Sequence, residues 1–214
     1  MRQAAIIPFL LIASGVSAQD GDRRDYGRPI QSPENLGDQA MRSAARCVVD
    51  KVPGSARKVL DTDIGSDEEA KRVKGLVGVG RECFQPQWPA FPPTAFRDAM
   101  AEVTYRKAHR TEPANPAGAL PASFGVVPAD RKGTPAQEAA WGMAAIANCA
   151  VYAGPHEAHE WIVGPRNVDE EQRRFALLQP AIGRCVAPGQ AAVLTARNFR
   201  GPVAAALLAR ADKK

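Results

Sequence analysis

The densest group of side chains able to do chemistry is the HEAHE run at residues 156–160. On a helix, His156, His159 and Glu160 stand at positions i, i+3 and i+4, so they share one side. Two imidazoles and a carboxylate at this spacing can bind a transition metal such as zinc. The order differs from that of zinc proteases, in which the second histidine follows the first by four residues. The run therefore predicts either a metal site at His156, His159 and Glu160 or a polar, solvated helix face.

Four cysteines are the next candidates, and their spacing is regular. They form two pairs, each with a separation of 36 residues: Cys47, Cys83, Cys149 and Cys185. An even cysteine number in an exported chain indicates disulfides, whereas a four-cysteine metal site normally contains closely spaced cysteine pairs. Of the three possible pairings, we favour Cys47–Cys83 with Cys149–Cys185, because the same local bond is then formed twice. Pairing between the two halves of the chain stays open at this point.

The equal cysteine spacing is part of a longer internal repeat. When the chain is shifted by 102 residues, Asp67-Glu68-Glu69 falls on residues 169–171, and 10 of the 37 positions from Cys47 to Cys83 are identical. After a further shift of one residue, Phe96-Arg97 matches Phe199-Arg200. The sequence thus predicts a unit of about 70 residues that is used twice.

The apolar spacing in both copies is helical, and four helices are predicted in each. In the first copy, the first helix contains Met41 and the fourth contains Phe96. The second helix begins at Pro53, since proline suits a first helical turn. The third begins after Ser66, which forms a capping-box pattern with Glu69. The second copy repeats these signals with Met143, Pro155, Asn167 with Glu170, and Phe199. We therefore predict an all-α fold: a tandem duplication of a four-helix, disulfide-containing module.

The third helix of the first copy carries the least regular pattern. We expect it to continue past residue 80 and to turn Val73, Leu76, Val77, Gly80 and Phe84 toward the core.

The chain divides into five expected segments. Residues 1–18 read as a secretory signal peptide, because Arg2 precedes a short apolar run and Ala18 ends a small-residue cleavage pattern. Residues 19–35 are charged and turn-forming, which predicts a flexible tail. Two helical modules are expected at 36–108 and 136–211, joined by a Pro-, Gly- and Ala-rich linker at 109–135.

Charge and composition limit the partners. The formal charge is +5, and removal of Arg2 with the signal makes it 5 − 1 = +4. Such a modest charge permits attraction to an anionic envelope surface but gives no nucleic-acid footprint. Aromatic residues make up 6% of the chain, so no platform for stacking bases is expected, and no motif predicts a cofactor or a membrane span after signal removal.

The duplicated cysteine frame, the acidic helix start at Asp67-Glu68-Glu69 and the Phe96-Arg97 pair together resemble a group of exported alphaproteobacterial proteins with a duplicated two-cysteine helical module. This group has no established activity, so the resemblance implies architecture and a periplasmic or secreted location. We expect a non-enzymatic binding or structural protein of the envelope, whose partner is an envelope protein or surface. The alternative is a metal-dependent enzyme or metal-binding protein with its site in the second module.

Overall fold

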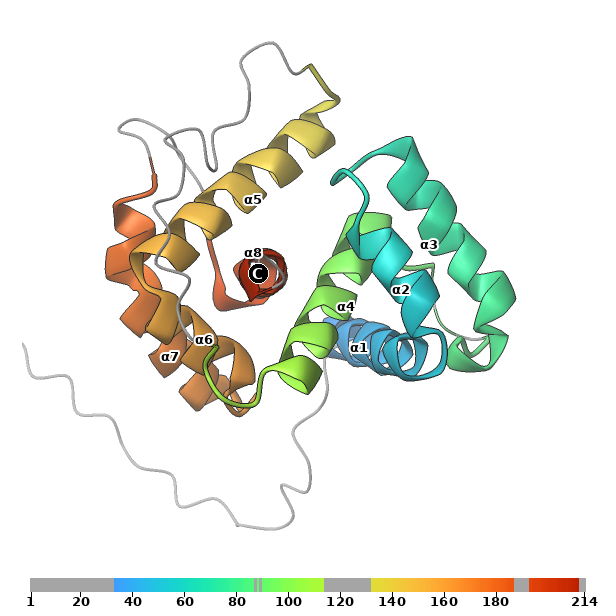
Figure 1. Ribbon diagram of the computed structural model, residues 1–214, viewed down its shortest axis with the longest axis horizontal. Helices are drawn as coiled ribbons and strands as arrows, with labels where there is room; N and C mark the ends of the chain where they lie inside the picture. Colours follow the sequence, from blue (N-terminus) through green and yellow to red (C-terminus); the bar gives the residue numbers. More distant parts are fainter. Residues whose placement is uncertain (1–32, 87, 89, 114–131, 187–192, 212–214) are drawn as a thin grey trace, which may run out of the picture.

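A computed structural model describes residues 33–86, 88, 90–113, 132–186 and 193–211. The described residues form α-helices and one short 3-10 turn, with no strand among them (Figure 1). The helices are α1 (Pro33–Lys51), α2 (Pro53–Leu60), α3 (Asp67–Val79), the turn η1 (Arg81–Cys83), α4 (Pro93–Ala108), α5 (Pro135–Ala153), α6 (Pro155–Val163), α7 (Val168–Gly183) and α8 (Ala196–Ala211).

Helix boundaries follow the predicted local signals. The Ser66 hydroxyl accepts a hydrogen bond from the Glu69 backbone N–H at 3.1 Å, and the Asn167 side chain accepts one from the Glu170 N–H at 2.9 Å. Each bond satisfies an amide that a helix start leaves without an intrahelical partner. Helices α2 and α6 begin at a proline, as predicted.

The two disulfides are Cys47–Cys83 and Cys149–Cys185, the pairing that the spacing favoured. The first ties α1 to η1, and the second ties α5 to the residues just after α7. Each bond therefore closes a loop inside its own half of the chain, and neither bond crosses between the halves.

The halves nevertheless meet over a wide apolar seam. In Figure 1, α8 stands near the centre of the molecule, with α1–α4 on one side and α5–α7 on the other. The main contact between the halves is made by α4 and α8. Ala101 and Tyr105 of α4 are completely buried, and both belong to the apolar core of the second half. The second core is thus completed by side chains from the first half.

The prediction for the third helix was wrong at its end. Helix α3 stops at Val79, and the Gly80 N–H donates the last helical bond to Leu76 O. The 3-10 turn that follows carries Cys83 to its partner, so Phe84 enters the core from outside the helix. Val77, which we expected to face inward, is 49% exposed.

Several predictions fall on residues that the structure does not describe. The signal peptide at 1–18 lies outside the described residues, as do most of the 19–35 tail and the central part of the 109–135 linker. None of the described helices combines the length and the apolar character that a membrane crossing requires.

Candidate functional site

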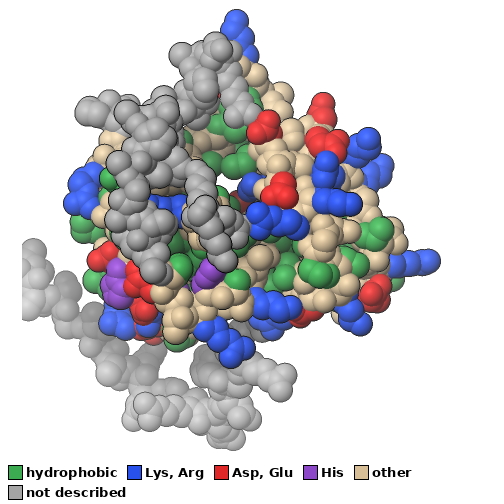
Figure 2. Space-filling view, in the orientation of Figure 1, with side chains coloured by type: hydrophobic (Ala, Val, Ile, Leu, Met, Phe, Trp, Pro, Cys, Tyr) green, Lys and Arg blue, Asp and Glu red, His purple; other side chains and the backbone are tan. Residues whose placement is uncertain are grey.

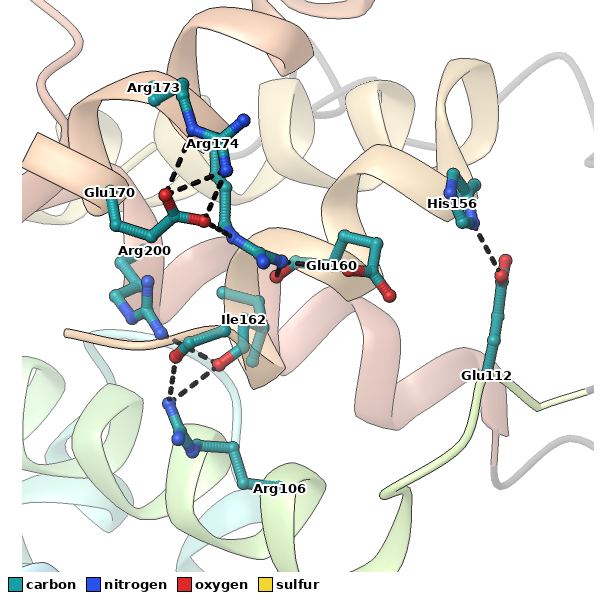
Figure 3. Close-up of polar contacts among 10 residues, drawn as sticks. Arg106, Glu112, His156, Glu160, Ile162, Glu170, Arg173, Arg174 and Arg200 are labelled. Atoms are coloured by element: carbon teal, nitrogen blue, oxygen red, sulfur yellow. Dashed lines mark hydrogen bonds and ion pairs between the residues drawn. The ribbon is translucent and has the colours of Figure 1, made fainter.

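The predicted metal ligands of α6 turn to different partners. His156 is exposed, and its Nδ1 lies 2.8 Å from Oε2 of Glu112 (Figure 3). This hydrogen bond, together with the negative charge of Glu112, raises the pKa of His156 above its ordinary value. His156 and Glu112 therefore form an ion pair at the surface when the imidazole is protonated.

His159 lies in the core, contrary to the expected polar face. It is 2% exposed, and its Nδ1 is 2.8 Å from the Tyr105 hydroxyl, which comes from α4 in the other half. Burial lowers the pKa of His159, so its imidazole is held neutral more readily than a free one. Helix α4 both shields the His159 imidazole from solvent and supplies its hydrogen-bond partner. The periodicity within α6 contains no information on either contact.

Glu160 belongs to a third set of contacts. Its carboxylate accepts from Arg174 Nη1 at 2.8 Å, and its carbonyl oxygen accepts from the same atom at 2.6 Å. Arg174 also donates from Nε to Glu170 at 2.6 Å (Figure 3). In the described part of the chain, no three His, Cys, Asp or Glu side chains are grouped so that they could hold a metal ion.

A buried carboxylate joins the two halves. Glu102 of α4 is 5% exposed and accepts from Arg200 of α8 at 3.1 Å and from Arg166 Nε at 2.9 Å. Burial alone would raise the pKa of Glu102, but the two guanidinium groups outweigh it and hold the pKa below the ordinary value. Glu102 therefore remains ionised and acts as a structural anchor of the α4–α8 seam.

A cavity with a volume of about 510 Å³ lies in the first half. It is bounded by α3, by residues 84–86, 88, 90 and 91, and by the start of α4. Its walls are mainly apolar, and its described lining contains no histidine, cysteine, serine, aspartate or glutamate. Ligand-binding pockets of proteins typically have this size and this predominance of apolar and aromatic surface.

Four aromatic rings form one wall of this cavity: Phe84, Trp88, Phe91 and Phe96. Phe91 is stacked on Phe96 with ring centroids 5.4 Å apart, and Phe84 tilts against Phe96 at 5.7 Å. Trp88 lies 6.2 Å from Phe91. Such ring pairs hold one another in fixed orientations, so the wall is built before any ligand arrives.

Helix α3 and the turn η1 contribute the charged side chains of the lining. Val73 and Val77 face the cavity from α3, while Lys74 and Arg81 are the ionisable side chains among its described lining residues. Both cations are exposed. The visible face of the molecule elsewhere shows Lys and Arg scattered among acidic side chains (Figure 2).

A second cavity of about 290 Å³ lies between the halves. It is lined by α4, α5 and α8, and its polar side chains include Asp98, Asn148 and Asn198. Burial raises the pKa of Asp98 to about 7, even though the positive charge of Arg97 acts against the rise. This cavity depends on both halves being in place.

Sequence reasoning missed both cavities. The segment 84–91 does carry a usable signal, because Phe84, Trp88 and Phe91 are concentrated there in a chain with few aromatic residues. The low aromatic content of the whole chain does not reveal this local concentration of aromatic residues.

No protein-family model, no curated protein and no solved structure matches the chain.

Proposed function

We propose that the chain is an exported, non-enzymatic binding protein, built as a tandem pair of four-helix modules, that takes an apolar small molecule into the 510 Å³ cavity of its first half. The observation that carries this proposal is the cavity itself, which is lined by four aromatic rings and by apolar side chains of α3. The described lining offers no hydroxyl or thiol nucleophile and no carboxyl or imidazole for proton transfer. These walls favour binding over catalysis.

Equivalent arginine contacts in the two halves support the duplication. Arg97 Nη2 donates to the carbonyl oxygen of Leu60 at 2.9 Å, and Arg200 Nη2 donates to that of Ile162 at 2.7 Å. Each guanidinium also lies near the last glutamate of the Asp-Glu-Glu run in its own half, at 3.6 and 3.5 Å. The sequence alignment pairs all of these positions.

A second set of contacts repeats in the same way. Arg72 Nη1 donates to the carbonyl oxygen of Lys58 at 3.2 Å, and Arg174 Nη1 donates to that of Glu160 at 2.6 Å. Both arginines also bond the middle glutamate of the neighbouring acidic run, at 2.7 and 2.6 Å. A tandem duplication produces two modules with the same internal hydrogen bonds and ion pairs.

Export is supported by the disulfides, since such bonds persist in oxidising compartments. We propose a periplasmic or secreted mature chain that begins at Gln19. Intact-mass measurement of the exported protein tests this start, and a mass that includes residues 1–18 would contradict it.

The binding proposal is tested with a neutral fluorescent probe, N-phenyl-1-naphthylamine, whose emission rises in apolar sites. The mature chain should bind it saturably, and V77W should weaken binding at least tenfold by filling the mouth of the cavity. V79W is the matched control, because Val79 is 58% exposed on the same helix and does not line the cavity. Equal binding by wild type and V77W, or no binding at all, would refute the proposed site.

A metal-dependent role makes a different prediction. Metal analysis of the purified chain would then find one equivalent of a transition metal, lost in a H156A/H159A variant. That result would favour the enzyme or metal-binding alternative over the binding protein proposed above.

A further inference from the structure

We infer that the ligand of the first-half cavity is an amphiphile: an apolar tail that lies against the aromatic wall, with a single anionic head group held at the rim by Lys74 and Arg81. This inference rests on the proposed function, and it adds the chemical class of the ligand. It follows from charge, from the shape of the lining, and from a comparison of the two halves.

The charge at the rim has one sign. Lys74 and Arg81 are the ionisable side chains of the described lining, and both are cations. Neither has an ion-pair or hydrogen-bond partner for its side chain among the described residues. Two cations that have no ion-pair partner among the described residues, beside an apolar cavity, attract an anion and repel an amine.

The apolar interior of the cavity determines that the inserted part of the ligand is apolar. The described lining beyond the two cations contains only one polar side chain, the amide of Gln85, and otherwise consists of apolar, proline and aromatic residues. A buried head group would there lose its water without gaining hydrogen bonds, which is costly. The charged end of the ligand must therefore stay at the rim, while its apolar part is inserted.

The second half differs at the aligned positions that supply the cations and the small side chain of the first-half lining. The sequence alignment places Ala176 opposite Lys74 and Gly183 opposite Arg81, so no cation stands there. It also places the larger Phe175 opposite Val73, and Phe175 packs on Trp161 with ring centroids 5.0 Å apart. Because neither the two cations nor the small Val73 side chain is repeated at these aligned positions, we assign binding to the first module.

The test is calorimetric titration of the mature chain at low salt with three ten-carbon probes: decanoate, decan-1-ol and decylammonium. Decanoate should bind about threefold to tenfold more tightly than decan-1-ol, since exposed ion pairs contribute weakly. Decylammonium should bind more weakly than decan-1-ol. Each methylene added to the carboxylate should improve Kd about fourfold until the cavity is filled.

The variant K74Q/R81Q should reduce decanoate binding to the level of decan-1-ol and leave decan-1-ol binding unchanged. K58Q/K71Q removes the same net charge from exposed positions outside the lining and should bind decanoate as wild type does. Equal affinity of wild type for decanoate and decan-1-ol would overturn the anionic head group and leave the binding function standing. Failure of all three probes to bind would overturn both.

Discussion

Asp98 on α4 lies directly against Gly201 on α8, at the centre of the seam between the two halves. A Cβ at Gly201 would overlap the Asp98 Cβ and would stand only 3.0 Å from its Cγ. The sequence alignment that pairs Phe96-Arg97 with Phe199-Arg200 also pairs these two positions. Helices α4 and α8 therefore lie in close contact at a place where one of two matched positions has no side chain.

Adding that side chain should loosen the seam. We expect G201A to destabilise the protein by about 1–3 kcal/mol, because an overpacked contact forces side chains or backbone to shift. Gly142, in the middle of α5, has open space around it, so the control G142A should stabilise the protein by about 0.5–1 kcal/mol through helix propensity. Urea denaturation followed by circular dichroism measures both free energies of unfolding. An unchanged free energy of unfolding for G201A would show that the contact between α4 and α8 can accept an added methyl group.

Asp98 should make stability depend on pH. Its folded pKa of about 7 lies above the unfolded value of about 3.9, so its contribution is complete below that lower value and is lost as the pH rises to about 7. Since D98N cannot ionise, it should gain roughly 2–4 kcal/mol on wild type between pH 4 and pH 8. Parallel stability profiles of the two proteins over this range would contradict the raised pKa.

The two disulfides should stabilise the protein separately. Each closes a 37-residue loop, and the double serine variant of either pair should lose about 2–5 kcal/mol. Non-reducing peptide mapping should recover Cys47 joined to Cys83 and Cys149 joined to Cys185. A mapped peptide that links one half to the other would overturn this pairing.

Cutting the chain between the halves should leave them associated. A specific protease site inserted between Pro121 and Ala122 should yield two fragments that separate on a denaturing, non-reducing gel, because no disulfide crosses the seam. In native size exclusion the fragments should elute together, because Tyr105 is buried in the core of the other half. Separate elution of two folded fragments would show that each module is independent of the other.

His159 should destabilise the fold in acid. Burial lowers its pKa below the unfolded value of about 6.5, so its stabilising contribution is present above that value and is lost as the pH falls through the folded pKa. The variant H159N keeps a polar atom near Tyr105 but cannot titrate, and its denaturation midpoint should fall less than that of wild type between pH 7.5 and pH 5. H156N is the control, since the exposed His156 has the opposite pKa shift.

The sequence by itself determined where several helices begin, although not where α3 ends. The side chains of Ser66 and Asn167 accept hydrogen bonds from free amides in the first turns of α3 and α7, and prolines begin α2 and α6. The cysteine spacing likewise favoured the two bonds that are seen. These features depend on residues a few positions apart or on a repeated interval, so the linear pattern contains the information.

Only the tertiary structure decided the environment of the chemically active side chains. The sequence pattern of α6 predicted an exposed His159. In the structure, α4 places Tyr105, which is 54 residues away in sequence, within hydrogen-bond distance of the His159 imidazole. Glu102 gave no signal because its partners Arg166 and Arg200 come from the other half. The cavity depends on the described aromatic residues that follow the turn at Cys83 lying beside side chains of α3. Burial and electrostatic partners arise from contacts between distant segments, so the periodicity within one helix cannot predict them.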